Sequence, residues 1–335
     1  MGYKFNIGSF NLYKYSYKSD NEIRKDIRRI ASIIRDDFDV VALQEVFSES
    51  AFKLLLRALG GNWEGRWASP KTSIDANKDS AKKPMNSQAA EGYAFLWKKR
   101  RFKLFEQAKA YGKKISEPRI YSEYSVDKRV NRLLRDPMWI RLVPVHGPYI
   151  EIRLFNTHIR FSKDGASEQN DDMGQISGDA GGLSRNEARK QELNVLIKEI
   201  MSRNNGGNAS NRPVYCFLVG DYNLNIDRPG NDSPYLPEVV MIQDGKATMR
   251  YVTVQSEKTT LKQPSSVDGT TIDKYSSNYD HFTYDEHLMI DIRQLKIEPS
   301  RIDTLSQEWC ENQNVAKHRQ EVSDHVPIKL RVTIG

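Results

Sequence analysis

Cysteine is almost absent from this chain, with Cys216 and Cys310 the only two among 335 residues. Two cysteines cannot form the disulfide framework of a small secreted protein, so a reducing compartment is the simplest home. No apolar run approaches the roughly 18 residues that a membrane-spanning helix needs. Strand-like alternation begins already at Tyr3, which leaves no room for a signal peptide. We therefore expect a cytoplasmic protein without stable membrane association.

The chain also lacks an obvious linker and any internal repeat. No stretch rich in proline, glycine and serine separates two self-sufficient halves. With 38% hydrophobic residues, a chain of this length can bury one large core. We expect a single domain over residues 1–335, with long polar loop insertions near 68–90, 163–183 and 255–277.

Positively charged residues outnumber negatively charged ones. Lysine and arginine number 51 against 44 aspartates and glutamates, which gives a net charge of +7. Such an excess favours a polyanionic partner such as nucleic acid. Anionic lipid headgroups would satisfy the same charge and stay open as an alternative.

Helical and strand-like patterns alternate along the chain. Isoleucines recur at helical spacing over residues 20–35, with Ser19 and Glu22 as a capping box at the start. A second helix over residues 52–59 ends at a glycine pair, and a third opens near Ser184. Strand-like runs are predicted at residues 3–7, 38–43, 93–97, 138–143, 149–156 and 214–219.

Acidic, amide and imidazole residues recur at or just past the ends of strand-like runs. Strand ends on one rim of a sheet can gather side chains from distant sequence positions. Hard oxygen donors suit magnesium or manganese better than zinc, which leaves the histidines for proton transfer. The residues at strand ends are Asn11, Glu45, His158, Asp221, Asn223, Asp280 and His325, and the oxygen donors are Asn11, Glu45, Asp221, Asn223 and Asp324.

Six short motifs that contain these residues follow one another from residue 9 to residue 325. They are Ser9-Phe10-Asn11, Leu43-Gln44-Glu45, Asn156-Thr157-His158, Gly220-Asp221-Tyr222-Asn223, Tyr279-Asp280-His281 and Ser323-Asp324-His325. The ordered set resembles the endonuclease/exonuclease/phosphatase superfamily. Any one of these motifs alone would be a weak signal, whereas six in the family's order are a strong one.

Within that superfamily the chain looks most like deoxyribonuclease I. Glu91 stands shortly before the strand at 93–97, where that branch has a glutamate that supports its first catalytic histidine. Arg135 stands before an acidic residue and a proline, similar to the phosphate-contacting arginine of that branch. Phe47 and Ala89 replace an arginine and a tyrosine with which that branch grips duplex DNA. These two replacements argue against non-specific cutting of double strands and leave the hydrolytic centre intact.

The resemblance implies an α+β fold, a two-sheet β-sandwich flanked by helices in four layers, with the active site at one edge. It also implies a metal-dependent phosphodiesterase. In that enzyme Glu45, Asn11 and Asp324 would hold Mg²⁺ or Mn²⁺ against a phosphate oxygen, and the ion would offset the charge that builds up as water attacks phosphorus.

The resemblance further implies two histidines that move protons, each backed by a carboxylate. His325, oriented by Asp280, would take the proton from the attacking water. His158, paired with Glu91, would protonate the departing oxygen, and these two roles could be exchanged.

Three more roles follow from the resemblance, and each admits alternatives. Asp221 and Asn223 would position the water, bind the phosphate or ligate a second metal. Arg135 would clamp a phosphate.

Three classes of function fit these residues. The first is a nuclease that hydrolyses phosphodiester bonds in DNA or RNA, which the basic composition favours. The second is a phosphatase or phospholipase of the same superfamily that acts on phosphoinositide or sphingomyelin headgroups, with the insertion at 163–183 as a specificity loop. The third is a catalytically silent binding module, against which the intact motifs speak. Oligomeric state is not indicated by any pattern in the chain.

Overall fold

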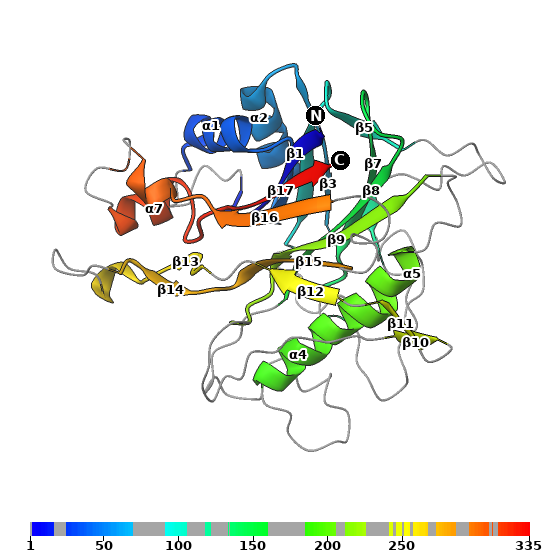
Figure 1. The fold of residues 1–335 in the computed structure, drawn as a ribbon. Helices are drawn as coiled ribbons and strands as arrows, with labels where there is room; N and C mark the ends of the chain where they lie inside the picture. Colours follow the sequence, from blue (N-terminus) through cyan, green and yellow to red (C-terminus); the bar gives the residue numbers. More distant parts are fainter. Residues whose placement is uncertain are drawn as a thin grey trace, which may run out of the picture.

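Two mixed β-sheets face each other at the centre of the computed structural model, with helices on their outer faces (Figure 1). The structure describes residues 2–16, 25–69, 91–105, 118–121, 133, 135–159, 185–205, 212–225, 241–243, 246–249, 251–254, 257–266, 273–285, 295–307, 310 and 314–335. Among these residues no helix is both long and apolar enough to cross a bilayer.

The first sheet has six strands in the order β16-β17-β1-β2-β4-β3. Strands β1 and β2 run parallel, with Ile7 beside Val40 and Asn11 beside Gln44, whereas the remaining neighbours are antiparallel. The strands of this sheet are β1 (Tyr3–Tyr15), β2 (Val40–Val46), β3 (Trp63–Ala68), β4 (Tyr93–Lys98), β16 (Leu295–Arg301) and β17 (Ile328–Ile334).

The second sheet has the order β12-β15-β9-β8-β7-β5, and a short strand β6 also pairs with β7. Here β8 and β9 form the parallel pair, which places His158 beside Asp221. Its strands are β5 (Phe102–Leu104), β6 (Arg119–Ile120), β7 (Met138–Pro144), β8 (Glu151–His158), β9 (Val214–Asp221), β12 (Tyr251–Val254) and β15 (Asp280–Asp285). Two small ribbons pair β10 (Met241–Gln243) with β11 (Lys246–Met249), and β13 (Thr260–Leu261) with β14 (Tyr275–Ser277).

The main core lies between the two sheets. Phe5, Phe95 and Leu330 of the first sheet pack there with Ile140 and Phe217 of the second, all fully or almost fully buried. Successive residues of a strand point to opposite faces, so the outer face of each sheet needs a cover of its own. Because both faces of the central strands are buried, their sequences are nearly continuous apolar runs and do not alternate strictly between apolar and polar residues.

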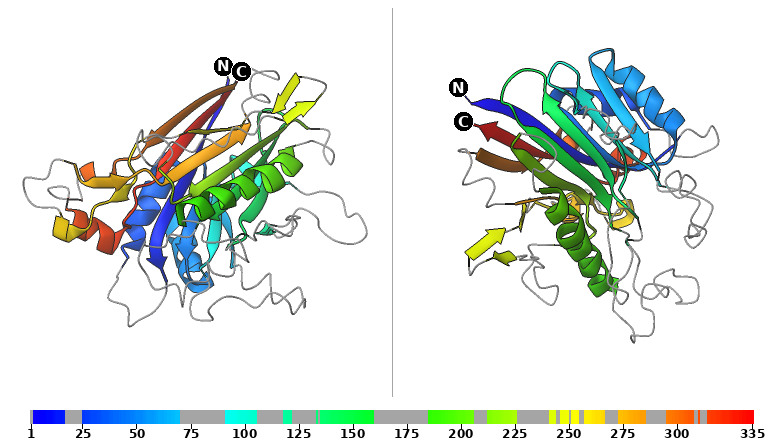
Figure 2. Two further views of the ribbon diagram at one scale, coloured as in Figure 1. Left: turned by 90° about the horizontal axis from the view of Figure 1, so that it is seen from below. Right: turned by 90° about the vertical axis from the view of Figure 1, so that its right-hand side faces the viewer.

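Helices supply that cover on both outer faces, as the two further views make plain (Figure 2). Helices α1 (Ile27–Asp37) and α2 (Glu49–Leu59) pack on the first sheet. Helix α4 (Arg185–Val195) continues into a π-helical turn, η3 (Leu196–Met201), and packs on the second sheet. The expected four-layer α+β sandwich is therefore confirmed. Smaller elements are α5 (Ser202–Asn205), α7 (Val315–Glu321) and the 3₁₀ turns η4 (Pro264–Ser266) and η5 (Thr304–Ser306).

The start of α1 differs from the prediction. The helix begins at Ile27 because the Asp26 side chain caps it and accepts a hydrogen bond from the Arg29 amide. The predicted capping residues Ser19 and Glu22 lie outside the described residues. The end of α2 agrees with the prediction, since Gly60 ends the helix at a φ of +87°, which favours glycine.

Parts of the expected insertions can be placed. Strands β13 and β14 lie within the insertion expected at 255–277 and form an antiparallel ribbon. The insertion at 163–183, and residues 70–90 of the first insertion, lie outside the described residues.

Candidate active site

The parallel strand pair in each sheet brings polar side chains to one common edge of the sandwich. Asn11 and Glu45 come from β1 and β2, and His158 and Asp221 are the last residues of β8 and β9. Parallel neighbours end at the same edge, so each pair delivers two functional side chains there. Residues that are far apart in the sequence thereby meet at one site.

Two further residues reach this edge from the beginnings of strands. Asp280 opens β15, and because β15 is antiparallel to β9 it lies opposite Asp221. The sequence had placed Asp280 at the end of a strand, and that prediction is wrong. His325 precedes β17, whose first residue Ile328 pairs with Ser9 of the antiparallel β1. The start of an antiparallel strand lies at the same edge as the end of its neighbour, so both residues still arrive at the site.

Buried polar side chains join the two sheets beneath this edge. Gln44 Nε2 donates to Asn156 Oδ1 at 2.7 Å, and Asn156 Nδ2 donates to the carbonyls of Leu43 and Ala94 at 2.9 and 3.2 Å. Gln44 also hydrogen bonds to the Ser9 hydroxyl. A fully bonded buried network of this kind fixes the relative position of the sheets. It gives Ser9, Gln44 and Asn156 of the sequence motifs a structural role behind the candidate catalytic residues.

The backbone at this edge is strained. Within the described part of the chain, every non-glycine residue with a positive φ lies here: Tyr13 (+44°), Lys14 (+53°), Glu45 (+57°) and Asn223 (+51°). Such conformations are costly for residues that carry a Cβ and cluster at functional sites. The bend in β1 brings the Lys14 amide to Glu45 Oε2 at 2.9 Å, which helps to orient this carboxylate.

The first histidine is part of a buried chain of charges. His158 Nδ1 hydrogen bonds to Glu91 Oε1, and Arg135 Nη2 lies 2.7 Å from Glu91 Oε2. The Tyr93 hydroxyl accepts a hydrogen bond from the His158 amide at 3.2 Å. Burial lowers the pKa of His158 and Arg135 lowers it too, but the charge and hydrogen bond of Glu91 outweigh them and raise the pKa above its ordinary value.

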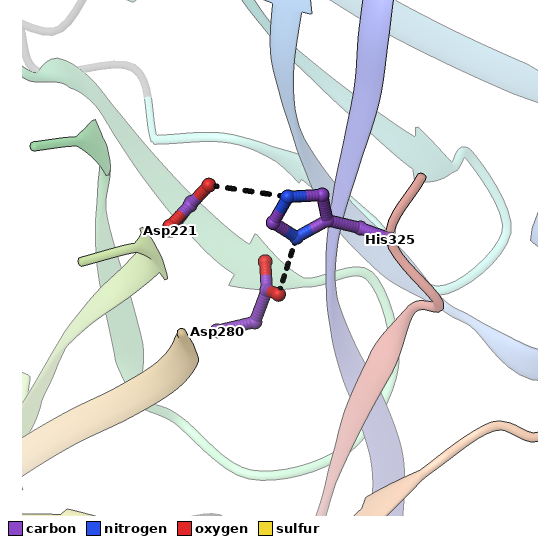
Figure 3. A group of neighbouring side chains, drawn as sticks. All are labelled: Asp221, Asp280 and His325. Atoms are coloured by element: carbon purple, nitrogen blue, oxygen red, sulfur yellow. Dashed lines mark hydrogen bonds and ion pairs between the residues drawn. The ribbon is translucent and has the colours of Figure 1, made fainter. Parts of the chain in front are cut away.

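The second histidine faces carboxylates on several sides (Figure 3). His325 Nδ1 lies 2.7 Å from Asp280 Oδ2, while Nε2 lies 3.6 Å from Asp221 Oδ2 and 3.9 Å from Asp324 Oδ1. Burial lowers the pKa of His325, but Asp280 and Asp221 raise it more strongly, and the net pKa lies well above its ordinary value. The imidazole therefore holds its proton firmly when no cation is bound nearby.

Asp221 lies between the two imidazoles. Its Oδ2 is 3.6 Å from the Nε2 atom of both His158 and His325, too far for a good hydrogen bond. Asn11 Nδ2 donates to the same oxygen at 3.0 Å, and the Asn223 amide donates to Oδ1 at 2.9 Å. Burial raises the pKa of Asp221 to about 6, although both histidines act in the opposite direction. The Nε2 atoms of both histidines thus face one shared point.

Glu45 and Asp324 are the best-placed oxygen donors for a divalent ion. Asp324 Oδ1 is buried and makes no hydrogen bond in the described part of the chain, whereas Oδ2 lies 3.3 Å from Arg319 Nη2. Both carboxylates interact electrostatically with the Lys25 ammonium, so they share one neighbourhood. Carboxylate oxygens of this kind fit Mg²⁺ or Mn²⁺.

Asn11 fits a supporting position better than that of a ligand. Its Nδ2 donates to Glu45 Oε1 at 3.2 Å as well as to Asp221, and its Oδ1 accepts from the Tyr13 amide at 2.9 Å. As placed, the amide joins the two carboxylates and turns its oxygen away from them.

A second group of donors also lies close enough to hold a cation. Ligand atoms of Asp221, Asp280 and His325 lie within 4.8 Å of one another. However, His325 Nδ1 already shares a proton with Asp280. This pairing, together with the position of His325 Nε2 beside Asp221 Oδ2, suits proton transfer.

Two predicted phosphate contacts are engaged elsewhere. The Arg135 guanidinium pairs with Glu91 and approaches the His158 carbonyl at 3.5 Å, and Asn223 Nδ2 donates to the Ile159 carbonyl at 2.7 Å. Sequence reasoning assigned no role to Tyr93, whose position two residues after Glu91 was the only available signal. It also missed Lys25, which directly precedes the residue that caps α1, and Arg319 of α7, neither of which belongs to a motif.

The Endonuclease/Exonuclease/phosphatase family model matches residues 5–236. No curated protein sequence matches the chain. An endonuclease/exonuclease/phosphatase family protein from Bacteroides thetaiotaomicron has a similar structure, with a TM-score of 0.54 and 13% identity over 100% of this chain and 99% of that one.

Two other solved structures are similar at comparable levels. D. rerio TDP2 complexed with a single-strand DNA product has a TM-score of 0.51 and 12% identity, over 98% of both chains. ANGEL2, a 2′,3′-cyclic phosphatase in complex with adenosine-2′,3′-vanadate, has a TM-score of 0.52 and 16% identity, over 99% of this chain and 96% of that one. At these identities the likeness concerns the fold.

Proposed function

The chain belongs to the endonuclease/exonuclease/phosphatase family of metal-dependent phosphodiester hydrolases, and from this premise we propose that it is a nuclease that hydrolyses DNA or RNA. One observation carries the proposal: His158 and His325, each backed by its own carboxylate, point their Nε2 atoms at the same oxygen of Asp221. Two proton-moving groups on either side of one point suit the displacement of an oxygen from phosphorus by water.

The cation belongs beside these histidines. Glu45 and Asp324 would hold Mg²⁺ or Mn²⁺, and Asn11 would keep Glu45 oriented through the hydrogen bond from its amide. When bound, the ion supplies positive charge at a non-bridging phosphate oxygen.

The histidines then divide the proton transfers. His325, held by Asp280, takes the proton of the attacking water, and His158, held by Glu91, gives a proton to the departing oxygen. Asp221 accepts hydrogen bonds from Asn11 and Asn223, so its free lone pairs can orient the water. The two histidine roles can be exchanged, and a substitution of Arg135 distinguishes the two orders.

Nucleic acid is the substrate class that charge favours. The chain carries a net charge of +7, and D. rerio TDP2, which shares its fold, has been captured with single-strand DNA. Phe47 stands where the deoxyribonuclease I branch has a minor-groove arginine, which favours single strands over intact duplex.

A phosphatase remains the second candidate because ANGEL2, which shares the fold, is a 2′,3′-cyclic phosphatase. The phospholipid headgroups compatible with the positive charge belong to the same alternative. A phosphatase and a phospholipase differ from a nuclease because they need to bind only one phosphate or one small headgroup of the substrate.

A panel of substrates tests the proposal. The purified chain is incubated with Mg²⁺ or Mn²⁺ and with plasmid, single-stranded DNA, RNA, a 2′,3′-cyclic nucleotide, inositol phosphates or sphingomyelin. We expect internal cleavage of labelled single strands, abolished by EDTA and absent from a preparation of the His158→Ala and His325→Ala double variant, which controls for contaminating nuclease. Turnover of the cyclic nucleotide or a headgroup alone would refute the nuclease assignment.

A further inference from the structure

Three positive side chains gather around one aromatic ring next to the candidate metal carboxylates. Lys14 Nζ, Lys25 Nζ and Arg319 Cζ lie 5.3, 5.4 and 5.7 Å from the centre of the Tyr13 ring. These distances are within the range of cation–π attraction. We call Tyr13, Lys14, Lys25 and Arg319 the Tyr13 cluster.

Three separate elements build the Tyr13 cluster. Tyr13 and Lys14 occupy the strained bend of β1, Lys25 directly precedes the residue that caps α1, and Arg319 belongs to α7. Lys25 Nζ donates to the Arg319 carbonyl at 3.4 Å, which ties two of these elements together. The fold therefore brings the cations together from sequence positions as far apart as 14 and 319.

The Tyr13 cluster adjoins both candidate metal ligands. The Lys14 amide donates to Glu45 Oε2 at 2.9 Å, and Arg319 Nη2 lies 3.3 Å from Asp324 Oδ2. A ligand on the cluster would therefore lie next to a phosphate at the metal.

The charges of the Tyr13 cluster are not balanced within the described part of the chain. There, Arg319 pairs with Asp324, but neither Lys14 nor Lys25 has a carboxylate within ion-pair distance. Burial lowers the pKa of Lys25 to about 8, with Arg319 acting in the same direction and Asp324 and Glu45 opposing it. Like charges repel, so cations gathered at one place are stabilised by an anion that joins them.

A metal ion would sharpen this imbalance. Glu45 and Asp324 are the carboxylates that the Lys14 amide and the Arg319 guanidinium contact, and a divalent cation held by these carboxylates would offset their charge. The positive charge of the Tyr13 cluster would then be less balanced by the protein, and an external anion would stabilise it more.

We propose that the Tyr13 cluster is a subsite for a second phosphate, the one that neighbours the scissile phosphate in a nucleic acid strand. The inference rests on the proposed function and specifies how it selects a substrate. Lys14 and Lys25 contact the phosphate, and Arg319 keeps Asp324 in place beside it. A strand fills both positions at once, whereas a small diester or a monoester fills only one.

Binding without turnover tests the subsite. Fluorescence anisotropy measures the affinity of a fluorescein-labelled single-stranded DNA oligonucleotide in EDTA for the wild type, Lys14→Gln, Lys25→Gln and the double variant. We expect Kd to rise about tenfold in the double variant. The slope of log Kobs against log salt should become shallower by about 0.7, the value for one phosphate contact on a single strand.

Lys99→Gln is the matched control. Lys99 is an exposed lysine that follows the last residue of β4, whereas Tyr93, near the site, is the first residue of that strand. It removes the same charge and should leave both quantities as in the wild type. Lys14 is exposed as well, so Lys14→Gln gives an answer even where Lys25→Gln fails to fold. Affinity and slope unchanged in Lys14→Gln and in any folded Lys25 variant would overturn the subsite.

Two further results separate this inference from the proposed function. If the wild type binds the oligonucleotide through Lys14 and Lys25 but cleaves no strand, the subsite is supported and the nuclease assignment is refuted. If the wild type cleaves strands and the lysine variants bind the oligonucleotide as the wild type does, the nuclease assignment is supported and the subsite is refuted. Binding of inositol 1,4-bisphosphate that depends on both lysines, with no binding of the oligonucleotide, would replace the strand by a headgroup and overturn the inference.

Discussion

The two histidines of the site form the same chemical unit on different supports. His158 is the last residue of β8, which pairs with strands on both sides. His325 lies on the link between α7 and β17, where a single bridge to Thr260 is its strand contact. Side chains hold the link instead: the Ser323 hydroxyl donates to the Asn11 carbonyl at 2.6 Å and accepts from the His325 amide at 3.1 Å. A regular sheet positions one imidazole, and a set of specific hydrogen bonds positions the other.

Their electrostatic surroundings differ as well. The carboxylate behind His158 is shared with Arg135, which lowers the pKa of that histidine. His325 faces Asp280, Asp221 and Asp324, all of which raise its pKa. The two units are thus tuned in different ways, one by a permanent guanidinium of the protein and the other by carboxylates that a bound cation would partly neutralise.

Removal of either imidazole has the largest expected effect. His158→Ala and His325→Ala should each lower turnover at least ~100-fold, because acid–base assistance contributes roughly 10² to 10⁴ in rate. Steady-state kinetics on a labelled oligonucleotide measures the loss, and circular dichroism checks the fold. Near-normal turnover in either variant would show that its histidine moves no proton in the rate-determining step.

A substitution at Arg135 should have an intermediate effect and identify the role of His158. Arg135→Gln removes a charge that lowers the pKa of His158, so the limb of the pH–rate profile that belongs to this residue moves to higher pH. The acidic limb moves if His158 is the base, and the alkaline limb moves if it is the acid. Turnover near pH 7 should fall about tenfold, as for the loss of a charged hydrogen bond.

Arg135→Lys is the matched control for this experiment because it keeps the charge and loses the planar fork. It should lower turnover with a smaller displacement of the limb. An unmoved profile in Arg135→Gln would mean that Glu91 alone sets the proton affinity of His158.

The same contrast between regular and irregular supports explains what the sequence could predict. The resemblance of the motifs predicted the four layers. The edge at which Glu45, His158 and Asp221 gather could be predicted from the residues themselves, because strands with apolar runs end directly at these residues. Asp280 was assigned to the wrong end of its strand because an apolar pattern carries no information on strand direction. The start of α1 was misplaced because Asp26 and Ser19 are equally good capping residues and only packing chooses between them.

The resemblance predicted the pairs His158–Glu91 and His325–Asp280, which the structure forms, but other contacts between several elements could not be predicted. The resemblance suggested that Arg135 binds phosphate, but nothing in a sequence reveals that its guanidinium pairs with Glu91. The Tyr13 cluster combines a strained bend, a helix start and a distant helix. A strained bend and a tertiary pairing leave no periodic signal, so these features required coordinates.

The smallest expected change in activity concerns His318, which hydrogen bonds to the segment between α7 and β17 that contains His325. His318 is completely buried, its Nδ1 donates to the Ser323 carbonyl at 2.6 Å and its Nε2 accepts from the Thr304 hydroxyl at 2.7 Å. Replacement by glutamine keeps a donor and an acceptor. We therefore expect turnover to fall only a few-fold, and stability near neutral pH to fall by about 1 kcal/mol for weakened hydrogen bonds.

The pH dependence of stability gives a sharper test of these hydrogen bonds of His318. Burial lowers the pKa of His318 to about 4, whereas an unfolded histidine has a pKa of about 6.5. Between these values the unfolded chain binds more protons, so this contribution is complete above about pH 6.5 and is lost as pH falls to about 4, by roughly 3 kcal/mol in total. Urea unfolding at several pH values should show a shallower decline over this window in His318→Gln than in the wild type. Equal declines in both proteins would mean that His318 does not stay neutral in the fold, and the link to His325 would then need another support.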